Sequence, residues 1–451
     1  MRERLLSEIA AVVGGRLEGD DVAIRGVSTD SRDAEPGELF VALTGERVDG
    51  HTFLETAREK GAAALVSTPS GAMPEVIVGD TAAALLALAS DEREKVNATI
   101  VGITGSTGKT SVKDLTASVL ASRFRVHASP RSFNTEVGVP LTLLNAPPDA
   151  EVIVVEMGSR GPGHIATLCE VARPRIGVVT SVGLAHMEMF RTIDVVAAAK
   201  AELVEALPGD GIAVLNGDDR IVRGFDARTD ASVVRYGLAK DADVRGEEVT
   251  LDPDGRPSFT LNSREGTERI ELPIPGEHMV GNALAAAAVG ISLGLSPGEC
   301  AAGLKDARLS PWRMEVFEGA DGIRVVNDAY NANPSSMAAA LKAARWMARD
   351  GRSIAVLGEM AELGDHSASE HEHVGELLAR LGIDHLIVVG DRAVAIAIGA
   401  EREGVEPERI LRVDTADAAA KAVRNLARKG DVVLLKGSRV AGLERVAEAI
   451  R

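Results

Sequence analysis

A glycine-rich loop constrains the fold of this chain more than any other segment. Residues 104–111 read T-G-S-T-G-K-T-S and follow an apolar run, residues 98–103, that predicts a β-strand. A helical pattern begins near Val112. A strand, a glycine turn and a helix in this order bring backbone N–H groups and the positive end of the helix dipole to one point. The sequence therefore predicts a phosphate-binding loop between a strand and a helix.

The amides and side chains of this loop suit phosphate binding. We expect the N–H groups of Ser106 to Thr110 to turn toward phosphate oxygens, Lys109 to reach the terminal phosphates and the Thr110 hydroxyl to bind magnesium. The usual pattern has a glycine where this chain has Ile103, so the loop is a tighter variant. A plain turn is the alternative, because such a short string can arise by chance. The expected nucleotide contacts are Gly105, Ser106, Thr107, Gly108, Lys109, Thr110 and Ser111.

The composition excludes some classes of protein. At 451 residues the chain is long enough for about three domains of roughly 150 residues. Hydrophobic residues make up 45% and aromatic residues 3%, so the cores must be built from Ala, Val, Leu and Ile. The net charge of -17 argues against nucleic acid as a partner, because phosphate backbones are bound by basic surfaces.

The sequence carries no signal for export or membrane insertion. Charged residues interrupt the N-terminus, and the longest apolar run, residues 283–295, is too short to span a bilayer. Cys169 and Cys300 lack metal-ligand spacing, which indicates buried free thiols. We therefore expect a cytoplasmic protein without membrane insertion. We also expect a monomer, although no residue pattern reports on the oligomeric state.

Alternating strand and helix patterns predict an α/β protein of three domains. Residues 1–97 contain apolar strands at 37–43 and 63–66 and a helical pattern at 53–61, which indicate a small N-terminal α/β module. Two larger predicted domains follow it.

The predicted central domain spans residues 98–311. Its continuous apolar runs at residues 151–155, 176–180 and 212–216 are typical of parallel strands covered on both faces. Residues 226–275 are richer in charge and turn residues, and their alternating apolar positions predict antiparallel strands. We expect a P-loop-type, mostly parallel sheet with appended antiparallel strands.

The predicted C-terminal domain spans residues 312–451. Five strand patterns alternate with helices there, at residues 323–327, 353–357, 385–389, 410–413 and 432–435. This alternation predicts a Rossmann-like doubly wound sheet.

Polar residues follow two of the central strands. Glu156 comes directly after one apolar run, and His186 lies just beyond the next. Ligands collect at the carboxyl ends of parallel strands, and carboxylate oxygens suit magnesium. A helix N-cap or a surface ion pair would also explain Glu156, and a lone histidine is usually a packed or exposed side chain. Both alternatives stay open at this point.

Three further residues each have two interpretations. Lys200 lies in a strong helical pattern, where the default is a solvated lysine forming helix-surface pairs. Asn282 precedes an alanine-rich helix and could be an N-cap or a nucleotide contact. Arg313 stands next to the predicted domain boundary, where it could clamp phosphate or join two domains by an ion pair.

The third domain begins with a strand that ends at Asp328. A polar loop, residues 329–335, follows it and leads to a proline at a helix start. Farther along, His366, His371 and His373 lie among acidic residues. This composition resembles a metal cluster, but we expect a solvated loop and a first helical turn, where acids suit the helix dipole.

Eight segments in order resemble the Mur ligase family, ATP-dependent enzymes that form amide bonds in peptidoglycan precursor synthesis. They are T-G-S-T-G-K-T-S at 104–111, N-T-E-V-G-V-P at 134–140, E-M-G at 156–158, A-H-M-E at 185–188, A-A-K-A-E-L at 198–203, G-E-H-M-V-G-N at 276–282, P-W-R-M-E at 311–315 and K-G-S-R at 436–439. The resemblance covers nearly the whole chain. D-A-Y-N-A-N-P at 328–334 resembles family members that add D-alanyl-D-alanine, and we find no D-N-P-[RK] motif of the diamino-acid-adding members. One departure is His164, where a glutamate often stands.

This resemblance implies a reaction and its substrates. The expected substrates are UDP-N-acetylmuramoyl-tripeptide and D-alanyl-D-alanine, with ATP and Mg²⁺. A carboxylate does not react with an amine at neutral pH, because negative charge shields its carbon and it has no leaving group. Phosphorylation by ATP would give an acyl phosphate that the amine attacks, and both steps build charge that cations must stabilise.

The resemblance also implies roles for single residues. Lys109 and the loop amides would bind the β- and γ-phosphates, Thr110 and Glu156 one magnesium ion, and His186 a second. Lys200 resembles the family's carbamylated lysine, in which CO₂ turns the amine into an anionic oxygen ligand near two cations. The other implied contacts are Asn282, Arg313 and Asp328 for the nucleotide, Ser31 and Arg32 for the uridine nucleotide, and Asn134, Asn331 and Asn333 for substrate.

Two alternative functions remain at this point. A sibling enzyme would use the same chemistry on another amino acid or add glutamate to folate, but the folate enzyme lacks a uridine-nucleotide module such as the one around Asp30–Arg32. A P-loop switch protein would bind nucleotide only to change partners, and Glu156, His186 and Lys200 would then share no role.

Overall fold

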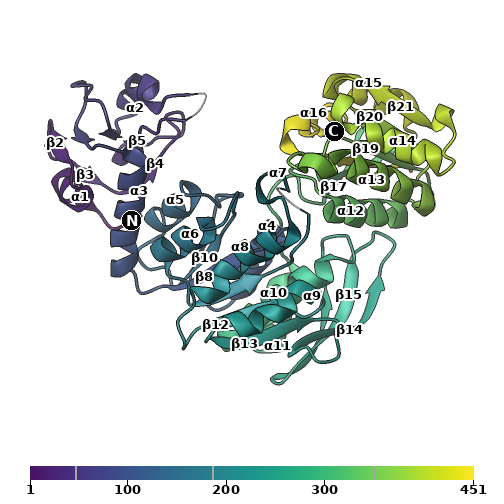
Figure 1. The fold of residues 1–451 in the computed structure, drawn as a ribbon, viewed down its shortest axis with the longest axis horizontal. Coiled ribbons are helices and arrows are strands. Elements are labelled where there is room, and N and C mark those ends of the chain that lie inside the picture. The colour runs from purple at the N-terminus through teal and green to yellow at the C-terminus, as the bar shows by residue number, and fades with distance from the viewer. Residues whose placement is uncertain (46–47, 185–186, 350) are drawn as a thin grey trace.

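The structure is a computed structural model that describes residues 1–45, 48–184, 187–349 and 351–451. Its strands form three main sheets, of five, nine and six strands, and one two-stranded ribbon, β1 (Arg4–Leu5) with β3 (Ala23–Ile24). Figure 1 shows the three sheets in succession, with the N-terminal part at one side and the C-terminal part at the other. The predicted α/β fold class is confirmed. No helix among the described residues is long and apolar enough to cross a membrane.

The N-terminal sheet is small and mostly parallel. Its strands are β2 (Arg16–Glu18), β4 (Gly26–Ser28), β5 (Glu38–Val41), β6 (Ala63–Val66) and β7 (Glu75–Ile77), in the order β2-β7-β6-β5-β4 with only β2 antiparallel. Its helices are α1 (Leu6–Val13), α2 (Leu54–Glu59) and α3 (Thr81–Lys95). Asp80 caps α3 by accepting hydrogen bonds from the N–H groups of Ala82 and Ala83.

The central sheet holds the predicted loop. Its order is β16-β15-β14-β13-β12-β11-β8-β10-β9, and all neighbours from β14 to β9 are parallel. The strands are β8 (Thr99–Thr104), β9 (Val126–Ala128), β10 (Val152–Glu156), β11 (Ile176–Val179), β12 (Ile212–Asn216), β13 (Ser232–Gly237), β14 (Val244–Leu251), β15 (Pro257–Ser263) and β16 (Gly266–Glu271).

The antiparallel addition is smaller than predicted. The pairs β14–β15 and β15–β16 are antiparallel, as expected, but β13 pairs with β12 in parallel. A short helical crossover joins β12 to β13 and consists of α9 (Arg220–Arg223) and a following 3₁₀ turn. It returns the chain to the end of the sheet at which β12 starts, so β13 runs parallel to β12.

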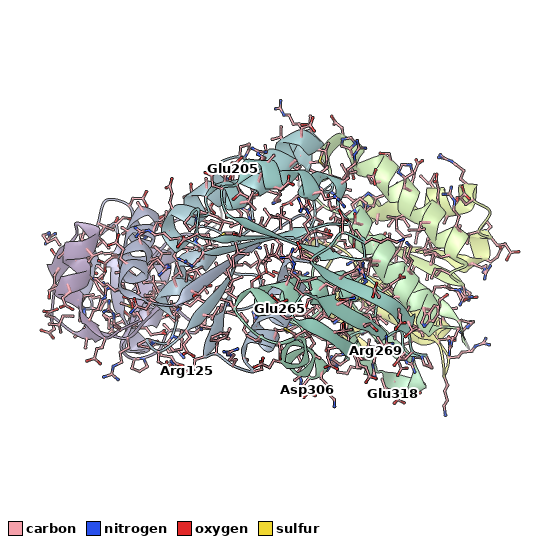
Figure 2. The ribbon with its side chains drawn as sticks, turned by 90° about the horizontal axis from the view of Figure 1, so that it is seen from below. Arg125, Glu205, Glu265, Arg269, Asp306 and Glu318 are labelled. Carbon is pink, nitrogen blue, oxygen red and sulfur yellow. The ribbon has the colours of Figure 1, made fainter. Side chains whose placement is uncertain are left out.

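Helices cover both faces of the central sheet. They are α4 (Lys109–Leu120), α5 (Gly138–Leu144), α6 (His164–Ala172), α7 (Met187–Phe190), α8 (Ile193–Glu205), α10 (Met279–Ser292) and α11 (Pro297–Lys305). Val101 and Ile103 of β8 pack toward α4 and α10, whereas Ile100 belongs to the core shared with α5 and α6. Charged side chains such as Arg125, Glu205 and Arg269 project from the outside of this body (Figure 2).

Helix α4 begins at Lys109, three residues before the predicted start near Val112. Gly108 is its N-cap and has a φ of 84°, so the turn closes directly before Lys109. This earlier start places Lys109 and Thr110 in the first turn of the helix, where the N–H groups have no partner inside the helix.

The C-terminal sheet is doubly wound. Its order is β17-β18-β22-β19-β20-β21, from β17 (Glu315–Glu318), β18 (Arg324–Asn327), β19 (Ser353–Leu357), β20 (His385–Val389), β21 (Ile410–Val413) and β22 (Val432–Lys436). Its helices are α12 (Pro334–Met347), α13 (Ser367–Leu381), α14 (Val394–Arg402), α15 (Ala416–Leu426) and α16 (Glu444–Ala449). The five predicted strands are present, and the antiparallel β17 was missed because its four residues, E-V-F-E, carry little apolar signal.

Two cysteines and one histidine are buried side chains. Cys169 and Cys300 are free and buried, as predicted. The prediction of a solvated histidine segment is wrong for His371, which is 1% exposed and accepts a 2.8 Å hydrogen bond from the Met360 N–H. His371 lies on the inward face of α13, which the local composition does not reveal. No three His, Cys, Asp or Glu side chains within the described ranges are grouped to hold a metal ion.

Candidate active site

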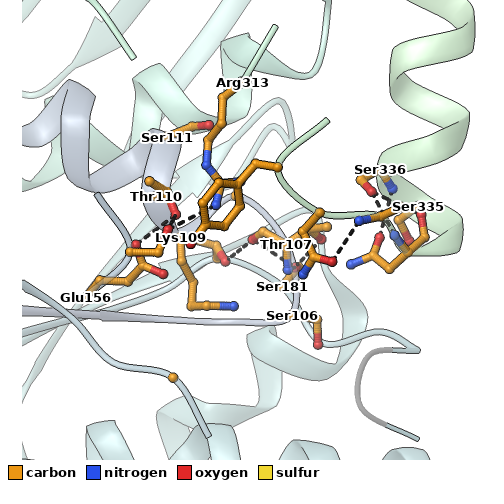
Figure 3. Close-up of a pocket in the computed structure, with 18 of the residues that line it drawn as sticks. Ser106, Thr107, Lys109, Thr110, Ser111, Glu156, Ser181, Arg313, Ser335 and Ser336 are labelled. Carbon is orange, nitrogen blue, oxygen red and sulfur yellow. Dashed lines mark hydrogen bonds between the residues drawn. The ribbon is translucent and has the colours of Figure 1, made fainter. Parts of the chain in front are cut away.

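A pocket of about 630 Å³ lies between the central sheet and the C-terminal sheet (Figure 3). The loop after β8, the end of β10 and the start of α10 line one side. The segment from Arg313 to Ser336 and the end of β22 line the other. Two separate sheets therefore present side chains to one space.

Two positions of the loop require glycine. Gly105 has a φ of 144°, and a side chain there would collide with the Thr180 hydroxyl, 2.0 Å from the position of a Cβ atom. Gly108 has a φ of 84°, and a Cβ atom there would lie 2.8 Å from Asn282 Oδ1. Both glycines let the backbone turn tightly against β11 and α10, which shapes the phosphate loop.

The loop amides divide into two groups. The Ser106 N–H donates to the Ser181 carbonyl over 2.8 Å, and the Thr107 N–H donates to the Ser181 hydroxyl over 3.1 Å. The expectation that these two amides face phosphate is therefore wrong for this structure, because the loop after β11 occupies them. The N–H groups from Gly108 to Ser111 have no hydrogen-bond partner in the described part of the chain. They remain the donors for an anion.

Lys109 folds back over the loop. Its Nζ donates to the Gly105 carbonyl over 2.6 Å. Burial in the pocket lowers the pKa of Lys109, Glu156 opposes this shift and Arg313 adds to it. The residue is partly exposed, so water weakens these effects. Lys109 therefore has the position and the charge to reach an anion held by the loop.

Glu156 is the last residue of β10 and is buried. Its Oε2 accepts a 2.8 Å hydrogen bond from the Thr110 hydroxyl, and its Oε1 accepts a 2.7 Å bond from Asn134 Nδ2. It is 1% exposed and lies inside a strand, so it is neither a helix N-cap nor a surface residue. The Thr110 hydroxyl and the Glu156 carboxylate are hard oxygen donors, which suit magnesium.

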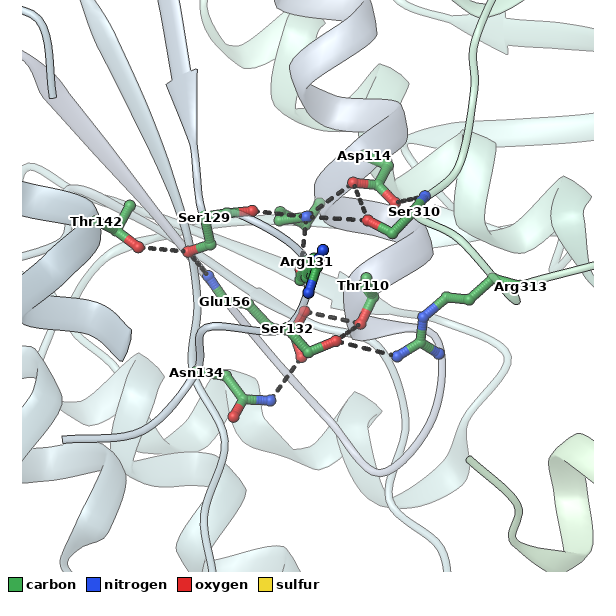
Figure 4. A network of polar contacts seen from close by, with 11 residues as sticks. Thr110, Asp114, Ser129, Arg131, Ser132, Asn134, Thr142, Glu156, Ser310 and Arg313 are labelled. Carbon is green, nitrogen blue, oxygen red and sulfur yellow. Dashed lines mark hydrogen bonds and ion pairs between the residues drawn. The ribbon is translucent and has the colours of Figure 1, made fainter. Parts of the chain in front are cut away.

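Ser132 connects this pair to the other side of the pocket (Figure 4). Its hydroxyl lies 3.1 Å from Thr110 Oγ1 and accepts a 3.3 Å hydrogen bond from Arg313 Nη2. Since the Thr110 hydroxyl donates to Glu156, Ser132 must donate to Thr110. The relay runs from Arg313 through Ser132 and Thr110 to Glu156.

A buried lysine holds the neighbouring segments together. Lys113 Nζ donates to the carbonyls of Ser129 and Arg131, each over 2.8 Å, and pairs with Asp114 at 2.8 Å. The Asp114 carboxylate in turn accepts from the N–H of Ser310, which precedes the C-terminal sheet, over 2.7 Å. Helix α4, the segment after β9 and the connection to the C-terminal sheet thus meet at one point.

Lys200 is buried inside α8. It is 2% exposed, its Nζ donates a 2.6 Å hydrogen bond to Ser159 Oγ, and the Phe190 ring centroid lies 5.9 Å away. Burial lowers the pKa of Lys200 well below its usual value, Lys109 lowers it further and Glu202 opposes the shift. The default interpretation of a solvated lysine is therefore wrong. His186, the predicted partner at this site, lies outside the described residues.

Three predicted nucleotide contacts line the pocket. Asn282 lies inside α10, not before it, so the N-cap interpretation is wrong, and its side chain faces Gly108. Arg313 stacks on the Tyr330 ring, with 4.3 Å between its guanidinium carbon and the ring centroid. Its buried Nε has no partner among the described residues. Asp328 accepts a 3.1 Å hydrogen bond from the Met314 N–H and pairs with the buried Lys436. Among the described residues Arg313 forms no interdomain ion pair, and it donates to the Ser132 hydroxyl instead.

The predicted substrate contacts divide between two places. Asn134, Asn331 and Asn333 line the pocket, although Asn333 also caps α12 by accepting from the Ser336 N–H over 2.9 Å. Ser31 and Arg32 lie in the N-terminal part and do not line it. Ser31 is buried, and the exposed Arg32 holds the pKa of Asp30 at about 2 through a side-chain hydrogen bond.

Several residues of the site escaped the sequence analysis. Ser132, Lys113, Ser181 and Lys436 carry no local pattern that separates them from ordinary polar residues, although Lys436 stands in the K-G-S-R segment. Each acts through a partner from a distant segment of the chain.

The chain has clear similarity to one protein family over most of its length. The family models described as "Mur ligase family, catalytic domain", "Mur ligase middle domain" and "Mur ligase, glutamate ligase domain" match residues 23–107, 103–290 and 312–439. The chain belongs to the Mur ligase family.

Individual relatives in this family are similar to the chain over nearly its whole length. UDP-N-acetylmuramoyl-tripeptide–D-alanyl-D-alanine ligase of Mycobacterium tuberculosis (strain ATCC 25618 / H37Rv) is 40% identical, over 100% of this chain and 98% of that protein. The solved UDP-N-acetylmuramoylalanyl-D-glutamyl-2,6-diaminopimelate–D-alanyl-D-alanyl ligase from Acinetobacter baumannii is 28% identical with a TM-score of 0.85, covering 99% of this chain and 98% of that one. MurF ligase from Thermotoga maritima in complex with ADP is 29% identical with a TM-score of 0.81, covering 94% and 96%.

Proposed function

We propose that this chain is an ATP-dependent ligase that joins D-alanyl-D-alanine to UDP-N-acetylmuramoyl-tripeptide in peptidoglycan precursor synthesis. Full-length similarity to enzymes of that name supports the proposal. The observation that carries it is the 2.8 Å contact of Thr110 with Glu156, in a pocket that Arg313 and Asp328 enter from the other sheet. A phosphate site between two sheets is what a two-substrate ligase requires.

ATP would bind along the loop, and its three phosphates match the donors there. The amides of Gly108 to Ser111 and the Nε of Arg313 have no partner among the described residues, and together with the Lys109 ammonium they suit phosphate oxygens. Asn282 and Asp328 would contact the rest of the nucleotide. The ADP complex of the Thermotoga maritima relative supports this assignment.

Magnesium would be held by Thr110 and Glu156, with Ser132 adjacent. His186 is proposed to help hold a second ion. Bound magnesium would neutralise charge that develops on the transferred phosphoryl group. The oxygen donors present fit such an ion. The buried Glu156 carboxylate has two neutral hydrogen-bond partners, Thr110 and Asn134, and neither of them supplies a compensating positive charge.

Lys200 is proposed to be carbamylated. Only a neutral amine reacts with CO₂, and burial lowers the pKa of Lys200. The addition forms an N–C bond, releases one proton and leaves an anion. The anionic product would suit a position close to Lys109 and to bound cations.

The proposed reaction has two steps, and protein groups serve each. A carboxylate oxygen of the tripeptide attacks the γ-phosphorus, the bond to the β-phosphate oxygen breaks and ADP leaves. The amine of D-alanyl-D-alanine then attacks the acyl phosphate carbon, phosphate leaves and the amine loses a proton. Lys109, the loop amides and Arg313 would stabilise negative charge in both steps. Asn134, Asn331 and Asn333 would orient the substrates.

The proposed domains divide these tasks. Residues 1–97, with Ser31 and Arg32, would bind the uridine nucleotide; residues 98–311 would bind ATP; and residues 312–451 would bind the dipeptide and close on ATP. The proposed enzyme is cytoplasmic, since ATP is its phosphate donor and its cysteines are free thiols. It is also proposed to be a monomer. Light scattering at the mass of one chain would support the monomer.

One assay separates the candidate functions. Phosphate release that requires both UDP-N-acetylmuramoyl-tripeptide and D-alanyl-D-alanine is expected of the proposed ligase. A sibling enzyme would need another amino acid or folate in place of the dipeptide. Equal release without either acceptor is expected of a nucleotide switch and would contradict the ligase proposal.

A further inference from the structure

Arg160 is a cation of the pocket that has no partner among the described residues. The other lysine and arginine side chains in the described lining each have a partner: Lys109 donates to Gly105, Arg313 to Ser132 and Lys436 to Asp328, and Arg439 forms an ion pair with Glu444. Arg160 lines the same pocket, is exposed to it and makes no hydrogen bond or ion pair within the described part of the chain. A guanidinium has five donors in a planar fork, so an anionic ligand would find it ready to bind.

The backbone beside Arg160 is held in place. The Gly158 N–H donates to the Asn134 carbonyl over 2.8 Å, and the Ser159 hydroxyl accepts from Lys200. Arg160 thus projects from a fixed loop four residues after Glu156, at the carboxyl end of β10. An anion bound there would lie beside the proposed site of carboxylate activation and not in the phosphate loop itself.

Glu136, an acid of the same lining, has another partner. Glu136 pairs instead with His164, whose Nδ1 lies 3.1 Å from Glu136 Oε1. The two side chains are 43% and 41% exposed, so both are accessible to solvent. The pairing of Glu136 with His164 leaves the positive charge of Arg160 available.

The side of the pocket that holds Asn134 and Glu136 is joined to the N-terminal part of the molecule. The Asn145 side chain both accepts from the Val27 N–H at 2.9 Å and donates to the Val27 carbonyl at 2.8 Å. Helix α5, seven residues or about 10 Å long, joins this contact to the lining residues before Gly138. A substrate with its uridine end near Ser31 and its reacting carboxylate near Lys109 would pass this side of the pocket.

We propose that Arg160 binds a carboxylate of the tripeptide other than the one that is activated. This inference rests on the proposed function. The peptide named for the Acinetobacter baumannii relative contains D-glutamyl and 2,6-diaminopimelate residues. Both residues supply a carboxylate that is not the activated one. Lysine in the third position would supply only the carboxylate that is activated. A bidentate pair with Arg160 would hold the peptide in register for the reaction.

The test compares Arg160→Gln with the wild type on two tripeptide substrates, one with diaminopimelate and one with lysine in the third position. Loss of a charge-assisted pair should raise the KM for the UDP-linked tripeptide on the order of ten- to hundredfold. The kcat and the KM for ATP should change less than about twofold, because the contact is made equally in ground and transition states. Arg160→Lys should recover part of the loss.

The matched control is Arg264→Gln. Arg264 has an 88% exposed side chain and does not line the pocket. This variant should behave as the wild type, and unchanged thermal midpoints of all variants would exclude unfolding as the cause.

The pattern across the two substrates identifies the carboxylate. An equal KM increase on both assigns the contact to the D-glutamyl residue, and an increase confined to the diaminopimelate substrate assigns it to the third residue. An unchanged KM on both overturns the role of Arg160 while leaving the ligase intact. A wild type that forms no product with either tripeptide overturns the proposed function and this inference with it.

Discussion

The ammonium nitrogen of Lys200 lies 2.6 Å from the hydroxyl oxygen of Ser159, and only 2% of the lysine is exposed. A buried ammonium is costly unless a carboxylate pairs with it, and a hydroxyl is a weak substitute. The lowered pKa of Lys200 follows from this environment. The chain therefore maintains a poor location for a cation and a good one for a neutral, reactive amine.

Lys200→Ala should abolish most ligase activity, and added bicarbonate should restore part of it. The carbamate supplies oxygen ligands that alanine lacks. The measurement is phosphate release with and without bicarbonate, alongside carbon NMR of the wild type in isotope-labelled bicarbonate. Near-normal activity of the variant would exclude the proposed carbamate.

Lys200→Met should make the protein more stable at neutral pH in bicarbonate-free buffer. Because the pKa of Lys200 is lowered on folding, the unfolded chain binds more protons below the usual lysine pKa of about 10.4. The free energy of unfolding of the wild type therefore rises as the pH increases from the lowered pKa of Lys200 in the folded state toward about 10.4. The advantage of Lys200→Met should shrink over the same range, as denaturant midpoints at several pH values would reveal. A constant difference would mean that Lys200 does not titrate on unfolding.

Lys109→Ala should lower kcat/KM on the order of a hundredfold or more, because it removes a cation from the phosphates while charge is transferred. Lys95→Ala is the control, since Lys95 forms an exposed pair with Asp91 away from the pocket. Steady-state phosphate release measures both. Unaffected turnover of Lys109→Ala would mean that the loop is misassigned.

Glu156→Gln should raise the magnesium concentration required for half-maximal rate. The neutral amide keeps the shape of the carboxylate but removes the charge that binds the cation. A magnesium titration of the variant at saturating ATP gives the result. Identical titration curves for variant and wild type would place the metal elsewhere.

Lys113→Met should destabilise the protein by about 3 kcal/mol, because it breaks a buried ion pair and leaves Asp114 without its cation. The free energy of unfolding in denaturant tests this value. Lys95→Ala again serves as control and should change the stability by less than about 0.5 kcal/mol. An effect of Lys113→Met within that range would show that the network in Figure 4 contributes little.

The parallel sheets were largely predictable because their strands are buried on both faces. Runs such as residues 152–155 and 432–435 must then be continuously apolar, and this pattern is local. The strand β17 and the parallel direction of β13 were not predictable. The first depends on a partner strand, and the second on how the preceding crossover packs.

The candidate site also has some features that the sequence predicts and others that it does not. Glu156 ends β10 and the glycine-rich loop follows β8, so their proximity could be inferred from one strand and its neighbour. The burial of Lys200 could not be inferred, because its helix faces the loop that contains Ser159, forty-one residues earlier in the chain. His371 was misjudged for the same reason.

By itself, the sequence determined the phosphate loop, since strand, glycine turn and helix are set by neighbouring residues and by φ values that only glycine adopts readily. Its motifs also indicated the family. Only the tertiary structure decided which cations have a partner within the described ranges and which, such as Arg160, have none there. Hydrogen bonding and desolvation depend on groups that approach in space, and the Arg313–Ser132 contact joins residues separated by 181 positions in the chain.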